Sequence, residues 1–500
     1  MNAIVKTPDS HKKLKLFQRY FNKAVLYQSQ KNIALAVELY DKALYHNNNH
    51  LPTIQALGQL LQQSGEYDKA LMYYHRAAQL HRHSATLNNA MGECYENCQQ
   101  WDQAKKHYQK AIELREEYPE ALNNLGNLLR KAGNYQQAEF YLLKSLRLCI
   151  SVSTLVNLGI HMAEMHNYTQ AHSFFDHALR IQPFNNKIKW YKALSLLTEG
   201  EFKQGWELYT SNSLTSIDFP QTTVSNNGEQ VAAKLFDNKH VHIKGKQNIN
   251  DEIMFASCVQ EIATLSRTCT IECDERLVLL FQRSFEAVKV RPKSPNHMTH
   301  HLDTSENITL SLVNAVRHLR QSFHDFPKQC GHLQAAAQAT ELWKKQFGQR
   351  AGEINIGIAW RSADDESHNQ FTRLNEWQTI FNQVKCQLVN LQHGQVQQEL
   401  TQFPFPILDW PDCDQQNNIE QLAAQISALD LVVTANNTVA HLAGALGKTV
   451  WVILPYAANW RWFNGKNPCP WYSSARLFQV KKPGEWQTLF ESINSELLKQ

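Results

Sequence analysis

The chain has 500 residues, of which 43% are hydrophobic and 10% aromatic. A chain of this length and composition exceeds what a single hydrophobic core usually accommodates, so two or three domains are expected. Its 50 lysines and arginines nearly balance 46 aspartates and glutamates. The sequence contains no block of five like charges of the kind that would indicate a nucleic-acid partner. No apolar run reaches the roughly 18 to 20 residues of a membrane span, and the N-terminus lacks an apolar signal segment. We therefore expect a cytoplasmic, globular protein with no membrane span and no nucleic-acid partner.

The ten cysteines contain no C-x-x-C pair, and their nearest spacings are Cys94 to Cys98 and Cys269 to Cys273. A disulfide framework or a structural zinc site would need regular, closely paired cysteines. We therefore expect reduced, buried thiols.

Small residues recur at spacings of 33 or 34 residues through the first two fifths of the chain, namely Ala36, Ala70, Ala104, Ala138, Ala171 and Gly205. Glycines such as Gly58, Gly92, Gly126 and Gly159 lie twelve residues before several of them. Bulky residues lie four positions after them, at Tyr40, Tyr74, Tyr108, Leu142, Phe175 and Tyr209. This period indicates stacked helix pairs in which a small residue on one helix makes room for a bulky one on the next.

Units such as "ALNNLGNLLRKAGNYQQAEFYLLKSLRL" resemble the tetratricopeptide repeat over about 200 residues. The resemblance implies a right-handed superhelix whose concave groove binds a peptide or protein. Four amides fall on the helices that would line this groove and are candidates to bind an extended acceptor backbone: Asn88, Asn89, Asn123 and Asn124. Alternatively they are solvated helix-face residues. The last unit has Gly205 in place of alanine and adds Trp206, which predicts that it packs on the next domain.

The text from about 219 to 238 loses helical periodicity and is interpreted as a connector. Short apolar strands then alternate with helical segments, which predicts a parallel sheet. A mostly helical stretch is expected at 305–350, after which the alternation resumes. The expected strands are 240–245, 268–273, 288–290, 354–360, 386–392, 405–410, 429–435, 449–455 and 476–480. Two doubly wound α/β halves are therefore expected, with a ligand cleft between them.

One turn in the second half, within "VTANNTVAHLAGALGKTVWVILP" (433–455), has the physics of anion recognition. A buried strand ends, and the helix that follows presents free backbone N–H groups at its positive end. Ordinary strand-to-helix packing without a ligand is the alternative.

The run "ISALDLVVTANNTVAHLAGALGKTVWVILPYAANWRWF" together with "PWYSSARLFQV" resembles the nucleotide-sugar half of GT-B glycosyltransferases of the heptosyltransferase-like and O-linked N-acetylglucosamine transferase-like kinds. The whole chain is similar to bacterial proteins that fuse tetratricopeptide repeats to such a module, among them flagellin glycosyltransferases. The implied fold class is α + α/β, with the repeat superhelix at 1–218 and two Rossmann-like halves of a GT-B module at 219–350 and 351–500. The implied activity is inverting, metal-independent sugar transfer from a nucleotide-sugar to a Ser or Thr of a protein acceptor, and a flagellin acceptor is one candidate. No cofactor is implied beyond the donor.

"IKGKQNINDEIMF" is similar to the family's glycine-rich turn, and the resemblance makes Asp251 the candidate general base. Asp251 could instead cap the helix that follows it. The resemblance also implies a donor site formed by Arg361, Gln392, His393, Asn436, Asn437, Thr438, Val439, His441, Trp460 and Arg461. Several of these have plainer alternatives, since Arg361 could be a surface residue, His441 a packing histidine and Trp460 a core aromatic. Arg373 is a further cation that, like Arg361, could neutralise the charge of the leaving nucleotide.

The sequence departs from the family at two turns. Asn248 and Asn250 stand where glycines are usual, and asparagine is the residue that best tolerates left-handed geometry after glycine. Asn436 replaces an aspartate, so the charge is lost. A second hypothesis is therefore a non-catalytic adaptor with a decayed transferase module, and a third is a transferase for saccharide or lipid-linked acceptors. The Asp412-Cys413-Asp414 run resembles a metal-binding D-x-D, but a polar turn before a helix is expected there.

Overall fold

The computed structural model describes residues 8–210, 235–245, 248–293, 306–328, 331–348, 353–361 and 372–499. These residues fall into two compact units, Met1–His161 and Met162–Gln500. The predicted domain boundaries after residues 218 and 350 lie outside the described residues, as does most of the predicted connector, and they stay predictions.

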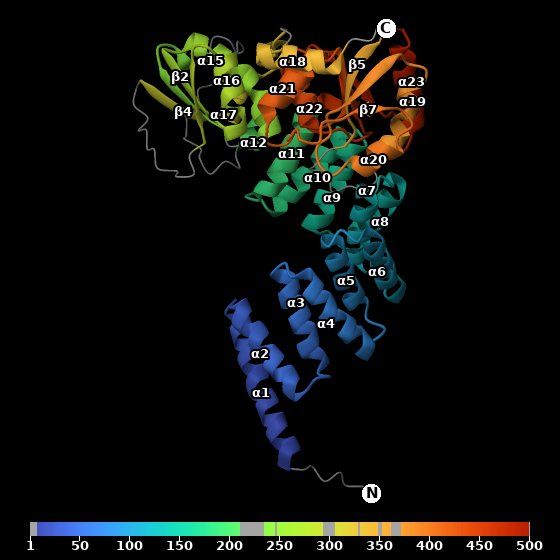
Figure 1. Cartoon of the computed structure of the whole chain (residues 1–500). Helices are drawn as coiled ribbons and strands as arrows, with labels where there is room; N and C mark the ends of the chain where they lie inside the picture. The colour runs from blue at the N-terminus through green and yellow to red at the C-terminus, as the bar shows by residue number, and fades with distance from the viewer. Residues whose placement is uncertain are drawn as a thin grey trace. The chain divides into compact units, whose positions relative to one another are not determined.

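The first unit consists of helices that pack in consecutive pairs, α1 with α2, α3 with α4, α5 with α6 and α7 with α8 (Figure 1). Their bounds are α1 Pro8–Ser29, α2 Ile33–His46, α3 Leu51–Gln63, α4 Tyr67–Leu80, α5 Ala85–Asn97, α6 Trp101–Leu114, α7 Pro119–Lys131 and α8 Tyr135–Leu148. Helix α9, Val152–Glu164, begins in this unit.

The close packing of small against bulky residues is confirmed. A Cβ added at Gly58 would lie 2.5 Å from the Tyr74 ring, and one added at Gly92 would lie 2.6 Å from the Tyr108 ring. Real Cβ atoms do not come this close to their neighbours, so the two helices of a pair can approach only because glycine has no side chain. Contacts between neighbouring helices therefore explain the spacing of small and bulky residues in the sequence.

The second unit begins with three helices, α10 (Tyr168–Ile181), α11 (Asn186–Glu199) and α12 (Phe202–Thr210). Trp206 of α12 is fully buried, and its indole N–H donates to the carbonyl of Arg320 at 2.9 Å. Its ring also contacts those of Phe255 and Trp460. The prediction that this last helical unit packs on the α/β region is confirmed.

A four-stranded parallel sheet follows, in the order β3-β2-β1-β4. Its strands are β1 His240–Lys244, β2 Thr268–Cys273, β3 Val288–Pro292 and β4 Asn307–Ser311. Its helical segments are α14 Ile249–Phe255, η1 Ala256–Cys258, α15 Val259–Leu265, η2 Glu275–Leu277, α16 Val278–Ser284, α17 Leu312–Leu319, η3 Phe323–Asp325 and α18 Ala337–Phe347. The stretch 305–350 was expected to be mostly helical, but it opens with the edge strand β4, whose short "NITLS" pattern is weak when taken alone.

The second sheet has six parallel strands in the order β10-β9-β8-β5-β6-β7. Its elements are β5 Ile354–Ala359, η4 Leu374–Trp377, α19 Gln378–Phe381, β6 Cys386–Asn390, α20 Gln397–Gln402, β7 Ile407–Leu408, α21 Ile419–Ala428, β8 Leu431–Ala435, α22 Thr438–Ala445, β9 Val450–Leu454, η5 Trp460–Gly465, β10 Ala475–Gln479 and α23 Trp486–Leu497. The chain order reverses between β5 and β8, where ligands of such sheets bind beyond the strand ends.

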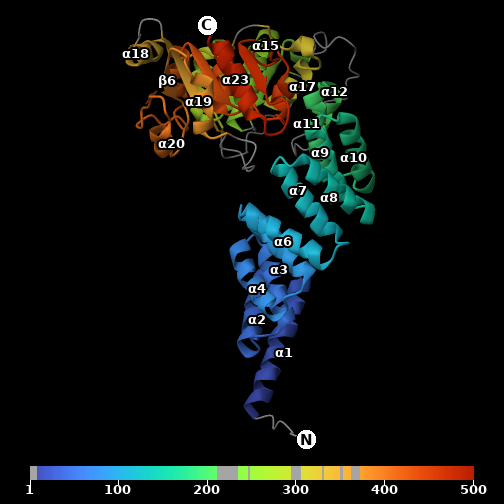
Figure 2. The same ribbon diagram turned by 90° about the vertical axis from the view of Figure 1, so that its right-hand side faces the viewer.

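Helices cover both faces of the second sheet. Helices α19 and α23 pack against each other on one face (Figure 2). There Phe381, Phe490 and Ile493, together with Trp377 of η4, pack in one core with side chains of the strands. Helices α21 and α22 share a larger core with the first sheet. The two α/β halves are thus joined by continuous apolar packing, so groups from both halves can be held at fixed positions in one site. No helix of the described residues is long and apolar enough to cross a membrane.

Candidate functional site

A cavity of about 280 Å³ lies between the two α/β halves, at the point where the strand order of the second sheet reverses. It is lined by Asn248, Ile249, Asn250, Asp274 and Arg276 of the first half and by Ala359, Leu391, Gln392, His393, Gln415, Gln416, Ile419, Leu422, Asn437, Thr438 and Val439 of the second. Five of the predicted donor-site residues therefore meet in one place.

Asn437 fixes the turn from β8 into α22. Its side-chain oxygen accepts from the backbone N–H of Ala440 at 3.2 Å and from the Thr434 hydroxyl at 3.0 Å. Its amide nitrogen donates to the carbonyl oxygen of Arg361 at 3.2 Å, just beyond the end of β5. One asparagine thus caps the helix and ties the two strands at which the chain order reverses.

The backbone N–H groups of Thr438 and Val439 begin α22, where a helix provides no carbonyl partner for them. Both residues line the cavity. These free donors and the positive end of the helix dipole favour an anionic group there.

The first half contributes the turn between β1 and α14. Asn248 has φ −68° and ψ 166°, and its side chain accepts from the backbone N–H of Asp251 at 3.0 Å. The left-handed geometry considered for the two asparagines is not used, because Asn248 is an extended helix cap and Asn250 lies within α14. The side-chain oxygen of Asn250 is buried and has no hydrogen-bond partner among the described residues, which leaves it available to a ligand donor.

Arg276 is a cavity residue that sequence reasoning missed. Asp274 binds it through two hydrogen bonds of 2.9 Å, from Nε and Nη2, and these bonds lower the pKa of the carboxyl group. The backbone N–H of Asp274 in turn donates to the buried carboxylate of Glu252 at 2.7 Å, and Glu252 also pairs with Lys293. Only the charged run "DER" after a strand marked the position, and such a run is more often a solvated turn.

Gln392 and His393 follow β6 at the cavity wall. The Gln392 side chain is 3% exposed, and its oxygen accepts from the backbone N–H of Arg361 at 2.9 Å. Burial, and then the nearby Arg361, lower the pKa of His393. The imidazole is therefore neutral near pH 7 and can both donate and accept a hydrogen bond.

Arg361 does not line the cavity. Its guanidinium pairs with Glu399 at 2.5 Å, while its backbone N–H and carbonyl bond to Gln392 and Asn437 of the site. The structure thus pairs its charge with a carboxylate of α20. The second cation considered, Arg373, is an exposed cap of the short helix η4.

Asp251 is 3% exposed and also lies outside the cavity lining. Its carboxylate accepts from Arg461 Nε at 2.6 Å, across 210 residues of sequence. This ion pair joins α14 of the first half to η5 of the second. Tyr209 lies near it, and burial, followed by the charge of Asp251, raises the pKa of its hydroxyl to about 12.

The side of α22 away from the cavity packs into what we call the buried cluster, formed by Asp251, Asn436, His441, Trp460, Arg461, Trp462 and Tyr472. His441 is 1% exposed, stacks on the Trp462 ring and is 3.1 Å from the Tyr472 hydroxyl through Nδ1. Burial, followed by the charge of Arg461, lowers its pKa to about 3.

Two other predicted donor residues, Asn436 and Trp460, also belong to this cluster. The Asn436 side-chain oxygen accepts from the Trp462 indole at 2.7 Å. Trp460 is 5% exposed and packs against aromatic rings of the first half. Neither residue lines the cavity between the halves.

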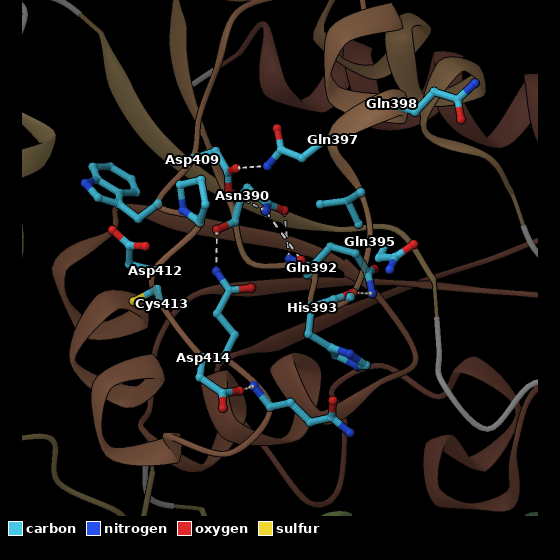
Figure 3. A pocket seen from close by; sticks show the side chains of 16 residues that line it. Asn390, Gln392, His393, Gln395, Gln397, Gln398, Asp409, Asp412, Cys413 and Asp414 are labelled. Carbon is cyan, nitrogen blue, oxygen red and sulfur yellow. Dashed lines mark hydrogen bonds between the residues drawn. The ribbon is translucent and has the colours of Figure 1, made fainter.

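A larger cavity of about 720 Å³ adjoins the first one and shares Gln392, His393, Gln415 and Gln416 with it. Its remaining lining is rich in amides and carboxylates and contains no lysine or arginine among the described residues (Figure 3). Asp409 accepts hydrogen bonds from Asn390 at 2.8 Å and from Gln397 at 2.6 Å. Such a lining suits neutral, hydroxyl-rich or amine-bearing groups better than phosphates.

Asp414 lies on the rim of this larger cavity. Its side chain accepts from the backbone N–H groups of Gln416 and Asn417 at 3.2 and 3.0 Å. The polar turn expected at the D-x-D run, just before α21, is therefore present.

In the first unit, three of the four predicted acceptor residues, Asn89, Asn123 and Asn124, are bonded to one another. Asn89 and Asn123 are each 6% exposed, while Asn88 and Asn124 are half-buried. Asn124 donates to Asn89 at 3.2 Å and to Glu93 at 2.9 Å, and Asn88 meets His107 at 3.1 Å. The two Asn124 bonds join α5 to α7, the first helices of two successive repeats, and the Asn88 contact joins α5 to α6.

Comparisons with known families identify the repeats. Models of the tetratricopeptide repeat match residues 17–50, 53–85, 82–151 and 120–183. The N-terminal region therefore contains tetratricopeptide repeats, as its 34-residue period predicted.

Protein FlbA of Caulobacter vibrioides is 25% identical to the chain over 329 residues, which are 62% of this chain and 54% of FlbA. The chain thus spans about half the length of that curated relative. Because 62% of 500 residues is about 310 and the repeat matches span only 167, from 17 to 183, the similarity extends beyond the repeats.

Several solved structures are similar to part of the chain. YrrB, a tetratricopeptide-repeat protein with an unusual peptide-binding site, is 24% identical over 34% of this chain and 88% of its own, with a TM-score of 0.29. PilF of Pseudomonas aeruginosa is 19% identical over 40% of this chain and 90% of its own, with a TM-score of 0.34. A tetratricopeptide-repeat protein of Thermus thermophilus is 17% identical over 36% and 99%, with a TM-score of 0.32. TM-scores below 0.5 establish no shared overall fold.

Proposed function

We propose that the chain is a protein O-glycosyltransferase of the GT-B type. The cavity between its α/β halves would bind a nucleotide-sugar, and its repeats would bind a protein acceptor whose Ser or Thr receives the sugar. Transfer would invert the anomeric carbon and need no metal ion, because the protein's own donors would stabilise the leaving phosphate.

The observation that carries this proposal is the composition of the cavity. The N-terminus of α22 supplies free N–H groups at Thr438 and Val439, and the first turn of α14 supplies Asn250. Both lie beyond the carboxyl ends of parallel strands, with the sheet order reversing beside them. Such a site favours a ligand with an anionic centre and flanking polar groups, and a nucleotide-sugar has this character.

The acceptor side of the proposal rests on the repeats, which commonly bind proteins or extended peptides. Because the amides of α5 and α7 are bonded to each other, an acceptor would meet the half-buried Asn88 and Asn124 before it met the buried Asn89 and Asn123. A flagellin acceptor is supported only by the sequence resemblance.

The test is intact-mass measurement of candidate acceptors, including flagellin, co-expressed with and without the full chain. A discrete mass increment that depends on the chain is expected, and its size names the sugar. The matched control is Asn437→Ala, which removes the cap of the α22 turn. If acceptors gain no mass while a saccharide or lipid-linked acceptor is glycosylated by the purified chain, the acceptor class is wrong.

Asp251 remains the proposed general base, and its pairing with Arg461 makes a single substitution hard to interpret. Replacing Asp251 alone would leave Arg461 buried without its partner. The double variant Asp251→Leu with Arg461→Met removes both charges and keeps similar volumes, so it should fold much as the natural chain does. A double variant that folds and still transfers sugar at the natural rate would rule out Asp251 as the base.

A second candidate is a non-catalytic adaptor, and one observation favours it: the carboxylate proposed as base is buried and ion-paired away from the cavity. Calorimetry with nucleoside diphosphates and their sugar derivatives separates the two functions. The enzyme should bind at least one member of the panel at micromolar to millimolar concentration. An adaptor with a decayed site should bind none.

A further inference from the structure

Arg276 is the single lysine or arginine in the lining of the cavity between the halves, counted over the described residues. It comes from η2, which follows β2 of the first half. The opposite wall carries the N-terminus of α22 from the second half. A cation and a set of free N–H groups therefore border the same 280 Å³.

The guanidinium of Arg276 is held at two edges and has donors left over. Nε and Nη2 bind the two oxygens of Asp274, and Nη1 donates to the carbonyl of Gln416 at 3.1 Å. A guanidinium has five N–H groups, so one on Nη1 and one on Nη2 stay unused by the described partners. The side chain is 32% exposed, so these donors can be reached from the cavity.

The residues around Arg276 are themselves held by hydrogen bonds. Asp274 is fixed by its backbone bond to Glu252, a carboxylate that is fully buried. The Gln416 contact ties the guanidinium to the second half, close to Gln415, which donates to the carbonyl of Asn390 at 2.9 Å. A planar donor fork held in this way loses little side-chain entropy when it binds an oxyanion.

We propose that Arg276 contacts the phosphate of the nucleotide ligand, so that both α/β halves, and not the second alone, bind the donor. This inference rests on the proposed function, because it takes a nucleotide as the ligand of the cavity. Arg276 would then fill the role that the sequence suggested for Arg361, which does not line the cavity and whose guanidinium pairs with Glu399.

Two consequences follow for the donor. Its phosphate would bridge Arg276 and the N–H groups of Thr438 and Val439, which places the nucleoside and the sugar on either side of that bridge. The carboxylates of the adjoining larger cavity would repel a second anionic group. Ligand affinity should therefore depend on the phosphate chiefly through Arg276 and the α22 turn.

The chain offers a closely matched control for Arg276. Arg283, on α16 of the same half, also has a 32% exposed side chain and also pairs with a carboxylate, that of Glu420. It likewise reaches a backbone carbonyl, at Gln334, 3.0 Å away. Arg283 does not line the cavity, so the two arginines differ mainly in their access to a ligand.

The experiment is isothermal titration of the full-length chain and its Arg276→Gln, Arg276→Lys and Arg283→Gln variants with UDP, GDP, CDP, ADP, CMP and the uncharged nucleosides. We expect Arg276→Gln to weaken binding of the tightest nucleotide about 10-fold or more and to flatten its salt dependence, since one charge-assisted contact is lost. Arg276→Lys should recover part of that loss, and Arg283→Gln should bind as the natural chain does. Thermal melts of each variant report folding.

The experiment distinguishes failure of the Arg276 inference from failure of the proposed function. If the natural chain binds a nucleotide and Arg276→Gln, shown to be folded, binds it equally well, this inference is overturned and the proposed function stands. An equal loss in Arg276→Gln and Arg283→Gln would also overturn it, because the effect would then come from docking of the two halves. If the natural chain binds no nucleotide in the panel, the proposed function falls and the inference falls with it.

Discussion

The two sides of helix α22 differ in how the polar groups beside them are bonded. On the side of the buried cluster, Asp251 binds Arg461, Asn436 binds Trp462, and His441 binds Tyr472. On the cavity side, the N–H groups of Thr438 and Val439 have no helical partner, and Arg276 has donors to spare. The contrast shows that similar side chains hold the two halves together on one side and leave bonding capacity for a ligand on the other.

The strongest test of this contrast compares two aspartates that each pair with an arginine. Asp251→Asn should lower the free energy of unfolding by about 3 to 5 kcal/mol, because Arg461 would be left buried without its counter-charge. Asp274→Asn should cost about 1 kcal/mol or less, because the Asp274 and Arg276 side chains are 23% and 32% exposed and water screens them. Urea unfolding of the second unit within the full chain, followed by tryptophan fluorescence, measures both. Similar losses would mean that the two sides of α22 do not differ in this way.

Local sequence patterns account for much of the fold. The 34-residue period of glycines and bulky residues predicted the helix pairs, because these contacts form between neighbouring helices. Alternating apolar runs predicted the strands of both sheets except β4, whose five residues sit at an edge and carry little pattern of their own. The family resemblance had also grouped Gln392, His393 and Asn437 to Val439 in one predicted site, and the structure brings these residues to one cavity.

The rest of the site depends on contacts between distant segments. Asp251 and Arg461 are 210 residues apart, so no local pattern reveals that they neutralise each other. Arg276 faces the cavity only because the two halves dock as they do. His441 and Asn436 lie near the α22 turn in sequence, yet the helical twist turns His441 toward Trp462 and away from the cavity.

The buried cluster should also make the protein sensitive to acid through His441. Its pKa is about 3 in the folded protein, against a usual value of 6.5, because of burial and then the charge of Arg461. The unfolded chain therefore binds more protons between these values, and stability falls as the pH drops below about 6.5. The histidine's full contribution is present above that pH.

His441→Gln should reduce the loss of stability between pH 7 and pH 4, although it lowers stability at pH 7 by removing the ring stacking. Urea midpoints at several pH values for the natural chain and the variant give the difference in slope. The exposed His324→Gln is the control and should leave the slope unchanged. An unchanged slope in His441→Gln would show that its neutral state adds nothing to the acid sensitivity of the buried cluster.

Asn437 lies between the two sides, and its substitution should affect both stability and binding. Asn437→Ala should cost about 1 to 2 kcal/mol as the loss of a helix cap, and it also removes the tie to the Arg361 carbonyl. Asn418→Ala removes the cap of α21 alone and should cost less. Only Asn437→Ala should also weaken nucleotide binding, because it loosens the turn that holds Thr438 and Val439. If both variants bind nucleotide like the natural chain, the α22 turn is not the anion site.

The smallest effect is expected at Asn436, where the family resemblance had suggested an aspartate. The Trp462 indole needs only an acceptor oxygen, and Asn436→Asp keeps one, so stability should change by about 0.5 kcal/mol or less. Asn436→Ala leaves that indole unpaired and should cost about 1 to 3 kcal/mol. Because Asn436 does not line the cavity, Asn436→Asp should change nucleotide affinity by less than about 2-fold. A 10-fold change, or about 1.4 kcal/mol, would mean that the ligand reaches the buried side of α22. The division of α22 into a structural side and a ligand side would then fail at this residue. The replacement of the expected aspartate by Asn436 would affect ligand binding, and Asn436 would not serve only to bond Trp462.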